Sequence, residues 1–403
     1  MQDVVKYHNN DVNQGIKIDW EKVKKRYRKL NCPKWVYNPL KPDYDIIGYN
    51  VCMSDRSEGK TTNPLIVGII LNDMYGIITH YIRYDTDTLA PKKLAQLFDT
   101  IFQFDYISKI TGGVWNSCFY YGKKWYFCNR DDTGAIIEKC PKHFMYCIGL
   151  NESDKLKSSY NCPVGDWIIF DEFVQLSGYG YNDFIAFTDI CKTIIRDRIS
   201  PVVLMMSNTI DITSPWFDEL CIRDDVNTMQ MGDIRQIETC EGTHIYLEIL
   251  PANKSEQRQK VNKRFFGFPN PKLAAITGKG TWAAESYPHI KYIHDDTTRV
   301  LFNKLFLKQS GKLLKLQLVK NDLGLCVYVV PATRTHDDSI ILTHTDITDK
   351  REMFGLGRQG TLLDVFWKLY RANKFYYATN LEGALLKSYI QQTKDENRKK
   401  GIL

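Results

Sequence analysis

Residues 54–61 read Ser54-Asp55-Arg56-Ser57-Glu58-Gly59-Lys60-Thr61. They follow the short apolar run Ile46–Met53, which predicts a buried strand. A strand leading into a loop that ends Gly-Lys-Thr is the layout of a P-loop, in which backbone N–H groups wrap phosphates, the Lys reaches them and the Thr binds Mg²⁺. Ser54 stands where the motif has its first glycine, so an ordinary strand-to-helix turn is the alternative. We take this stretch and Thr62 as the candidate nucleotide-binding loop.

A second stretch, Gly165–Phe173, is an apolar strand that ends in the adjacent carboxylates of Asp171 and Glu172. P-loop enzymes use one such acid to hold Mg²⁺ and often a second to orient the attacking water. We therefore predict that Asp171, with Thr61, holds the metal and that Glu172 acts on the water. Two solvated acids after a core strand are the alternative. Together the two motifs predict a nucleotide hydrolase that uses ATP and Mg²⁺.

A third apolar strand, Ser200–Thr209, also ends in small polar residues. We predict that Ser207 and Asn208 at its tip contact the bound nucleotide, although a plain strand end would look the same. Upstream, the amphipathic stretch Phe184–Ile195 predicts a helix, and Arg196 follows it. An arginine there is either solvated or reaches a neighbouring subunit, where it neutralises charge in the transition state.

Composition narrows the class of protein. A chain of 403 residues, 43% hydrophobic and 25% charged, predicts a soluble globular protein with two or three domains. No apolar run reaches the ~18–20 residues that span a bilayer, and the N-terminus has no signal-peptide pattern, so we expect a cytoplasmic protein without a membrane partner. The eleven cysteines form no C-x-x-C pair. A net charge of +7 and three basic clusters favour a phosphate-backbone partner; the clusters are Glu21–Arg28, Arg258–Arg264 and Arg398–Lys400.

The order of predicted elements indicates a mixed α/β protein in four parts. Residues 1–45 form an N-terminal extension, and 46–212 alternate strands and helices, as in a mostly parallel, helix-covered sheet. Residues 213–290 form a small linker or lid region. Residues 291–403 change character, with paired strands followed by helices, and predict a separate C-terminal α/β domain.

With these motifs in place, the chain resembles the genome-packaging ATPases of phages of the phi29 type, which belong to the terminase-like ASCE group of P-loop motors. The pieces that carry the resemblance come in order along the first half of the chain; they are Tyr37-Asn38-Pro39, Ser54–Thr61, Tyr81-Ile82-Arg83, Ile168–Phe173, the helix ending at Arg196, and Leu204–Asn208. Beyond that half the likeness is fainter and rests mainly on the order of elements.

The resemblance implies a motor that drives double-stranded DNA into a procapsid. Its setting would be the host cytoplasm at the portal vertex, and its partners would be the portal protein and copies of itself in a ring of five subunits. Whether a structural RNA joins them stays open. The resemblance also implies that Arg196 acts on the neighbouring subunit, that Lys157 acts across the same interface with Lys155 as its competitor, and that Arg56 is a loop arginine.

The resemblance also implies that the C-terminal domain is RNase H-like and derived from a nuclease. Two-metal nucleases need several carboxylates, yet the predicted first strand, Leu314–Lys320, carries none. Asp322, Asp346 and Asp364 are left as remnants, so we expect a domain that binds rather than cuts. The alternatives are a terminase-like ATPase with an active C-terminal nuclease, and a non-catalytic nucleotide-binding scaffold.

Overall fold

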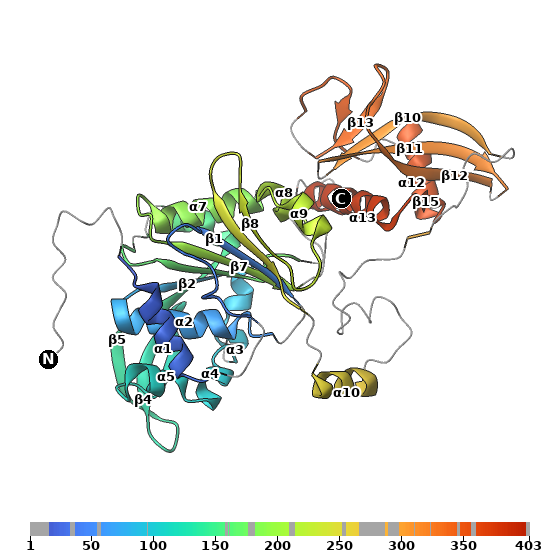
Figure 1. Ribbon diagram of the computed structural model, residues 1–403. Coiled ribbons are helices and arrows are strands. Elements are labelled where there is room, and N and C mark those ends of the chain that lie inside the picture. Colours follow the sequence, from blue (N-terminus) through green and yellow to red (C-terminus); the bar gives the residue numbers. More distant parts are fainter. Residues whose placement is uncertain are drawn as a thin grey trace.

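The computed structural model describes most of the chain; the described residues are 16–32, 37–54, 58–94, 96–157, 160, 162–175, 182–208, 214–251, 255–265, 287–288, 298–309, 311–322, 324–344, 347–355 and 360–399. Two sheets organise them, one of nine strands and one of six. Figure 1 shows the two sheets as separate bodies, with the first built from the N-terminal part of the chain. The predicted loop positions Asp55, Arg56 and Ser57, and also Asp346, lie outside the described residues.

The first sheet has the strand order β3-β4-β5-β2-β6-β7-β1-β9-β8. In that order the strands are Ser117–Tyr121, Lys124–Arg130, Ile136–Gly149, Thr79–Arg83, Trp167–Asp171, Val202–Asn208, Tyr49–Ser54, His244–Ile249 and Ile234–Glu238. The six strands from β5 to β9 pair in parallel, while β3, β4 and β8 add antiparallel edges. The mixed, mostly parallel sheet expected from the sequence is confirmed.

This strand order decides where the functional side chains meet. β7 lies between β1 and β6, and β6 lies next to β2, so the strand that leads into the predicted P-loop and the strand that ends in the two acids are not direct neighbours. Because all four strands are parallel, their carboxyl ends lie along one edge of the sheet, where parallel α/β proteins bind their ligands. The last residue of β1, Ser54, pairs with the last residue of β7, Asn208.

Helices cover both faces of the first sheet, which explains why its central strands are apolar along their whole length. One face carries α1, α2, η1, α3, α4 and α5, at Trp20–Lys29, Thr62–Tyr75, Thr86–Leu89, Pro91–Leu94, Asp99–Gln103 and Tyr106–Thr111. The other carries η2, α6, α7, α8 and α9, at Leu150–Glu152, Ser153–Lys157, Asp183–Ile195, Trp216–Glu219 and Arg223–Thr228. The helix predicted at 184–195 is α7.

Helix α2, which follows the predicted P-loop, packs very closely on the sheet. At Gly68 a Cβ would lie 2.3 Å from Thr79 Oγ1, so this position has no room for a side chain. Gly76 ends the helix in the left-handed conformation at φ 69°, which glycine adopts at little cost. The close approach fixes the start of α2, and with it Lys60 and Thr61, against the carboxyl edge of the sheet.

The second sheet has the order β14-β13-β10-β11-β12-β15. These strands are Glu352–Met353, Ile340–Thr343, Arg299–Gln309, Lys312–Asn321, Gly324–Ala332 and Phe375–Tyr377. β10, β11 and β12 form an antiparallel meander, and β13 returns parallel to β10. Helices α12 (Leu362–Arg371) and α13 (Asn380–Lys399) share one apolar core with this sheet. The meander with later parallel strands fits the RNase H-like expectation.

The predicted first strand of this body needs correction. Residues 314–320 belong to β11, and β10 precedes it. β10 escapes prediction because its first six residues are exposed or half-buried without a regular alternation. It also carries no Asp or Glu, so the expectation of an acid-free opening strand holds for the true first strand.

The segment between the two bodies does not form a separate sheet. β8 and β9 fall within the predicted linker region 213–290, yet β9 pairs with β1 and completes the first sheet. The basic helix α10 (Glu256–Phe265) lies apart from both sheets in Figure 1. Lys312 Nζ of β11 contacts Asp224 of α9 at 3.3 Å and joins the bodies. No helix in the described parts of the chain is long and apolar enough to cross a bilayer.

Candidate functional site

The described end of the predicted P-loop places Lys60 at the carboxyl edge of the sheet. Lys60 is largely buried, and its Nζ donates to Ser54 Oγ at 2.6 Å and to Asn208 Oδ1 at 3.1 Å. Gly59 has φ 79°, which requires a glycine at this turn. Ser54, the residue that departs from the P-loop motif, therefore has a contact of its own, since its hydroxyl helps to hold the lysine.

The candidate metal ligands meet beside this lysine. Thr61 Oγ1 donates to Asp171 Oδ2 at 3.0 Å, although the two residues belong to different elements and lie far apart in sequence. Thr61 precedes α2 as its N-cap residue but makes no side-chain capping bond; its hydroxyl is directed to Asp171 instead. Tyr81 OH donates to the same carboxylate oxygen at 2.7 Å. The hydroxyl and carboxylate predicted to bind the metal are thus brought together.

These residues fit a Mg²⁺ ion. Magnesium prefers oxygen ligands and is usually held by one or two carboxylates together with waters and substrate phosphates. Thr61 and Asp171 supply such a pair of oxygens. Across the described parts of the chain, three or more His, Cys, Asp or Glu side chains never gather into a metal-binding group. A closed protein cage for a metal is thus not seen among these residues.

Arg83, at the end of β2, is the side chain that sequence reasoning missed. Its Nη1 donates to Asp171 Oδ2 at 3.1 Å and its Nη2 to Glu172 Oε2 at 2.6 Å, so it bridges both acids. Burial by itself lowers the pKa of Arg83, but its electrostatic interactions with Tyr81, Asp171 and Glu172 outweigh burial and raise it above the ordinary value. The only sequence signal is the run 81–83 at the end of a strand, which contributes to the resemblance but suggests no role for Arg83 itself.

The two polar residues at the tip of β7 have different partners. Asn208 contacts Lys60, as described above. Ser207 is buried, and its Oγ accepts from the backbone N–H of Val174 and donates to the Val174 carbonyl, both at 3.2 Å. Asn208 therefore lies at the candidate phosphate site, whereas Ser207 fixes the segment that follows Glu172. Glu172 itself has φ 59°, a conformation that non-glycine residues rarely adopt.

Arg196 lies at the opposite edge of the sheet from Lys60. It directly follows α7, and the chain then enters the amino end of β7 at Val202. Strands of this length span roughly 17–20 Å, so Arg196 lies too far from the carboxyl edge to reach Lys60 of the same chain. Its side chain is exposed, in contrast to Arg198, which is buried and paired with Asp166 at 2.7 Å. Lys157 ends α6, but its side chain lies outside what the structure describes; Lys155, the competing residue, is exposed on the same helix.

A buried histidine lies at the same amino edge. His80 Nε2 contacts Tyr160 OH at 2.6 Å. Burial lowers the pKa of His80 to about 3, and the positive charges of Arg198 and His143 add to the effect. The folded pKa is thus below the unfolded value of about 6.5. The unfolded chain therefore takes up this proton first as the pH falls.

From this we predict a specific loss of stability in acid. Below pH about 6.5 and down to about 3, His80 should cost the folded state up to about 1.4 kcal/mol of unfolding free energy per pH unit. A His80→Gln variant should show a shallower decline between pH 6 and pH 4 in urea unfolding followed at several pH values. Equal slopes for the two proteins would contradict the prediction. His143 is present in both proteins and contributes equally.

Two solved structures are similar to this chain over most of its length. The bacteriophage Phi-29 viral genome packaging motor assembly shares 17% identity, with 89% of this chain and 100% of that chain covered, at a TM-score of 0.56. The Phi-28 gp11 DNA packaging motor shares 19% identity, with 89% and 97% covered, at a TM-score of 0.50. This chain has the fold of the phi29-type packaging motors. No protein-family model matches it, and neither does any curated protein sequence.

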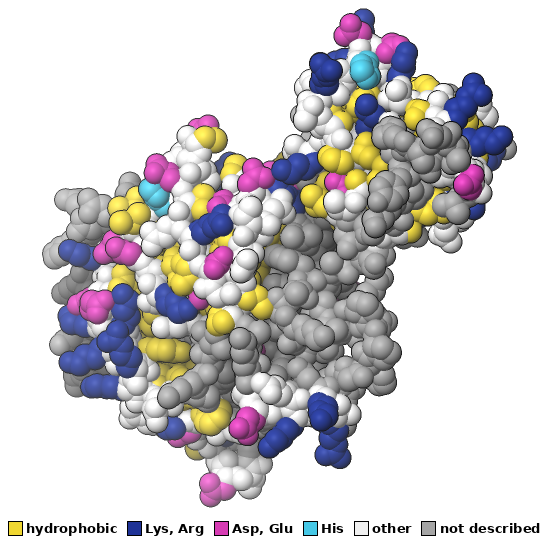
Figure 2. Space-filling view, turned by 45° about the vertical axis from the view of Figure 1, so that its right-hand side comes forward, with side chains coloured by type: hydrophobic (Ala, Val, Ile, Leu, Met, Phe, Trp, Pro, Cys, Tyr) yellow, Lys and Arg dark blue, Asp and Glu magenta, His cyan; other side chains and the backbone are white. Residues whose placement is uncertain are grey.

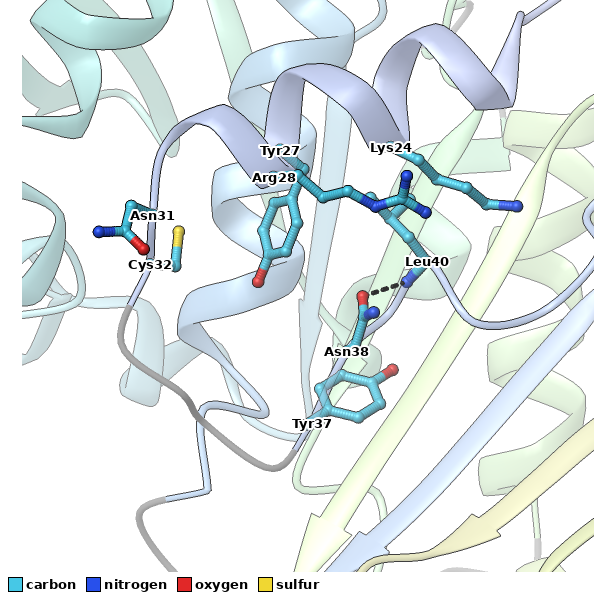
Figure 3. A pocket seen from close by; sticks show the side chains of 8 residues that line it. All are labelled: Lys24, Tyr27, Arg28, Asn31, Cys32, Tyr37, Asn38 and Leu40. Atoms are coloured by element: carbon cyan, nitrogen blue, oxygen red, sulfur yellow. Dashed lines mark hydrogen bonds between the residues drawn. The ribbon is translucent and has the colours of Figure 1, made fainter.

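A pocket lies beside α1 in this phi29-type fold. It has a volume of about 290 Å³ and lies between α1 and the segment that follows it; its lining residues are Lys24, Tyr27, Arg28, Asn31, Cys32, Tyr37, Asn38 and Leu40. In Figure 3 the side chains of α1 face those of Tyr37 and Asn38 across this space. The backbone N–H of Tyr37 donates to Glu58 O at 3.2 Å. The pocket is thus tied directly to the candidate phosphate loop.

Proposed function

We propose that this chain is an ATP-driven motor that moves double-stranded DNA into a viral procapsid. One observation carries the proposal: Lys60, the Thr61–Asp171 pair and Glu172 meet at the carboxyl edge of a sheet whose fold is that of packaging motors. The similarity in fold supports a role as a packaging motor. The proximity of these side chains supports ATP as the substrate that the motor hydrolyses.

Within one subunit, each residue has a distinct task. The backbone around Gly59 and the ammonium of Lys60 bind the phosphates, as in other P-loops. Thr61 and Asp171 would hold Mg²⁺, which neutralises phosphate charge when it is bound. Glu172 orients the attacking water, and Arg83 holds this carboxylate beside Asp171. Asn208 keeps Lys60 in place and is positioned to detect the terminal phosphate.

The pocket beside the P-loop suits the base of the nucleotide. It offers the ring of Tyr27 and the amide of Asn38 within reach of the loop that Tyr37 contacts. Aromatic rings and amides are groups that bind a planar, hydrogen-bonding base. We therefore include this pocket in the proposed ATP site.

Between subunits, Arg196 completes the site of a neighbour. It is exposed, it lies far from its own Lys60, and a head-to-tail contact that closes into a ring brings one edge of a subunit to the opposite edge of the next. The proposed ring has five subunits and sits on the portal protein at the portal vertex. Lys157 is proposed to act across the same contact.

Contacts to DNA are proposed to be made mainly to phosphates, since a packaging motor accepts any sequence. Figure 2 shows Lys and Arg side chains on both bodies, with acidic side chains among them. Lys304, Lys308 and Lys312 of the second body carry positive charge at its surface, each beside an acid. We propose a binding role for this body rather than cleavage.

Mixing two inactive variants tests the proposed function. Arg196→Ala and Lys60→Ala chains should each lose ATP hydrolysis by about 10³-fold or more, the usual worth of a transition-state arginine. Mixed before ring assembly, they should regain a readily measured part of the activity. In the mixture an Arg196→Ala subunit keeps its own Lys60 and receives the arginine of a Lys60→Ala neighbour.

Hydrolysis in these mixtures is measured with and without double-stranded DNA. The wild-type chain should hydrolyse ATP faster when DNA is present. If the wild-type chain hydrolyses no ATP under either condition, the proposed motor is excluded. If it does hydrolyse ATP but the mixture stays inactive, Arg196 does not act between subunits and only supports the fold.

A further inference from the structure

The turn that carries Arg196 is held in an unusual conformation. Arg196 has φ 52° and ψ −122°, in the half of backbone space that glycine normally occupies. Such a conformation persists only where the surroundings hold it, and it is typical of functional positions. Arg198 supplies one anchor, since its Nε donates to the Ile195 carbonyl at 3.2 Å while its Nη1 pairs with Asp166. The backbone beside Arg196 is thus linked through Arg198 to Asp166, the residue that precedes β6.

Tyr160 supplies a second anchor, this time for the side chain. Arg196 Nη2 donates to the Tyr160 carbonyl at 3.2 Å. The side chain of Tyr160 is itself held in place, because its hydroxyl contacts His80 Nε2 at 2.6 Å and its ring stacks on Tyr146 with the ring centroids 5.0 Å apart. His80 and Tyr146 are direct partners in the parallel pairing of β2 with β5. Tyr160 therefore connects the arginine to the middle of the sheet.

The same strand reaches the hydrolysis site of its own subunit. β2 carries His80 near its amino end and Arg83 at its carboxyl end, where Arg83 contacts both Asp171 and Glu172. The short strand β2 thus lies between the two acids of one hydrolysis site and Arg196, which is proposed to act in the site of the adjacent subunit. The guanidinium has five N–H donors, and the Tyr160 carbonyl engages one nitrogen, which sets the direction of the group while it stays at the surface.

We propose that Tyr160, held by His80, is a positioning residue that aims Arg196 at the nucleotide of the adjacent subunit. The proposal rests on the proposed function, because it requires Arg196 to act between subunits. Tyr160 itself does not touch the reacting atoms. The Tyr160 hydroxyl affects hydrolysis only by positioning Arg196. Removing this hydroxyl should therefore slow ATP hydrolysis in the neighbouring subunit and not in the subunit that carries Tyr160.

The test places Tyr160→Phe in one or the other partner of the mixed ring. The donor chain is Lys60→Ala, which lends Arg196, and the acceptor chain is Arg196→Ala, which carries the working site. In the donor, Tyr160→Phe should lower the recovered rate about tenfold, a usual consequence of a misplaced group, while the acceptor's KM for ATP is unchanged. In the acceptor, the same substitution should leave the recovered rate as it was.

A second variant removes the other partner of the hydrogen bond between Tyr160 OH and His80 Nε2. His80→Phe in the donor should reproduce the loss, and Tyr160→Phe combined with His80→Phe should add little to it. Tyr121→Phe, at the exposed tip of the β3–β4 hairpin, is the matched control and should change nothing. In a donor that also carries Lys157→Ala, Tyr160→Phe should still lower the recovered rate by the same factor, which separates an effect through Arg196 from one through Lys157.

The outcomes distinguish this proposal from the proposed function. Equal effects of Tyr160→Phe in donor and acceptor, or no effect in either, overturn the positioning role while the motor stands. Hydrolysis by the acceptor that carries the substitution also shows that the altered chain folds and assembles. A parent mixture that recovers no activity overturns action between subunits, and the positioning role with it.

Discussion

Replacing Lys60 by alanine should abolish ATP hydrolysis, with a loss of about 10³-fold or more when a preorganised cationic group at the transferred phosphate is removed. The structure makes the effect specific. Lys60 is the cation held by Ser54 and Asn208 at the carboxyl edge of the sheet. The substitution should also weaken ATP binding, because the lysine contacts the phosphates in the bound state as well as in the transition state.

The matched control for Lys60 is Lys368→Ala. Lys368 is exposed on α12 in the second body, where it pairs with Asp364. Both variants remove one positive charge from a helical or loop position, but only Lys60 faces the candidate site. Turnover is measured with Mg²⁺ at saturating ATP, together with the equilibrium affinity for ATP. Full turnover by Lys60→Ala would remove the P-loop assignment and the proposed function with it.

Replacing Glu172 by glutamine should give the second large effect, a loss of hydrolysis of about 10²–10⁴-fold with ATP binding retained. Glutamine keeps the size of the side chain and its ability to accept from Arg83, but it loses the negative charge that acts on water. A selective fall in kcat, with the affinity for ATP little changed, is the signature expected of a group used only in the chemical step.

Glu241→Gln is the control for this substitution, since Glu241 lies exposed in the turn between β8 and β9. It should hydrolyse ATP at the normal rate. If Glu172→Gln instead weakens ATP binding as strongly as it slows hydrolysis, the carboxylate serves the fold of the site through Arg83 rather than the water. Wild-type turnover by Glu172→Gln would assign the water to another residue.

Much of the local structure around the site could be predicted from the sequence. The apolar runs that become β1, β6 and β7 end in polar residues where the structure ends each strand. Such runs can be recognised because a strand buried on both faces needs apolar side chains along its length. The Gly-Lys-Thr ending of the loop also predicts where the loop lies in the fold, since such a loop connects a strand to a helix.

Other features depend on contacts that no local pattern records. Arg83 bridges two acids that lie 88 and 89 residues further along the chain, and the run 81–83 looks like any polar strand end. Ser54 counts against the motif in the sequence, yet in the structure its hydroxyl contacts Lys60. β10 has no regular alternation, so its place as the first strand of the second sheet emerges only from its pairing with β11 and β13.

The sequence by itself determined the elements and the chemical groups of the loop, because strand and helix formation depends on the spacing of apolar residues and on local backbone preferences. Only the tertiary structure decided which strands became neighbours. Inserting β7 between β1 and β6 brought Asn208 to Lys60, and placing β2 beside β6 brought Arg83 to the two acids. It also put Arg196 at the far edge of the sheet. The pairing of parallel strands joins segments distant in sequence, and its energy comes from packing on both faces of the sheet.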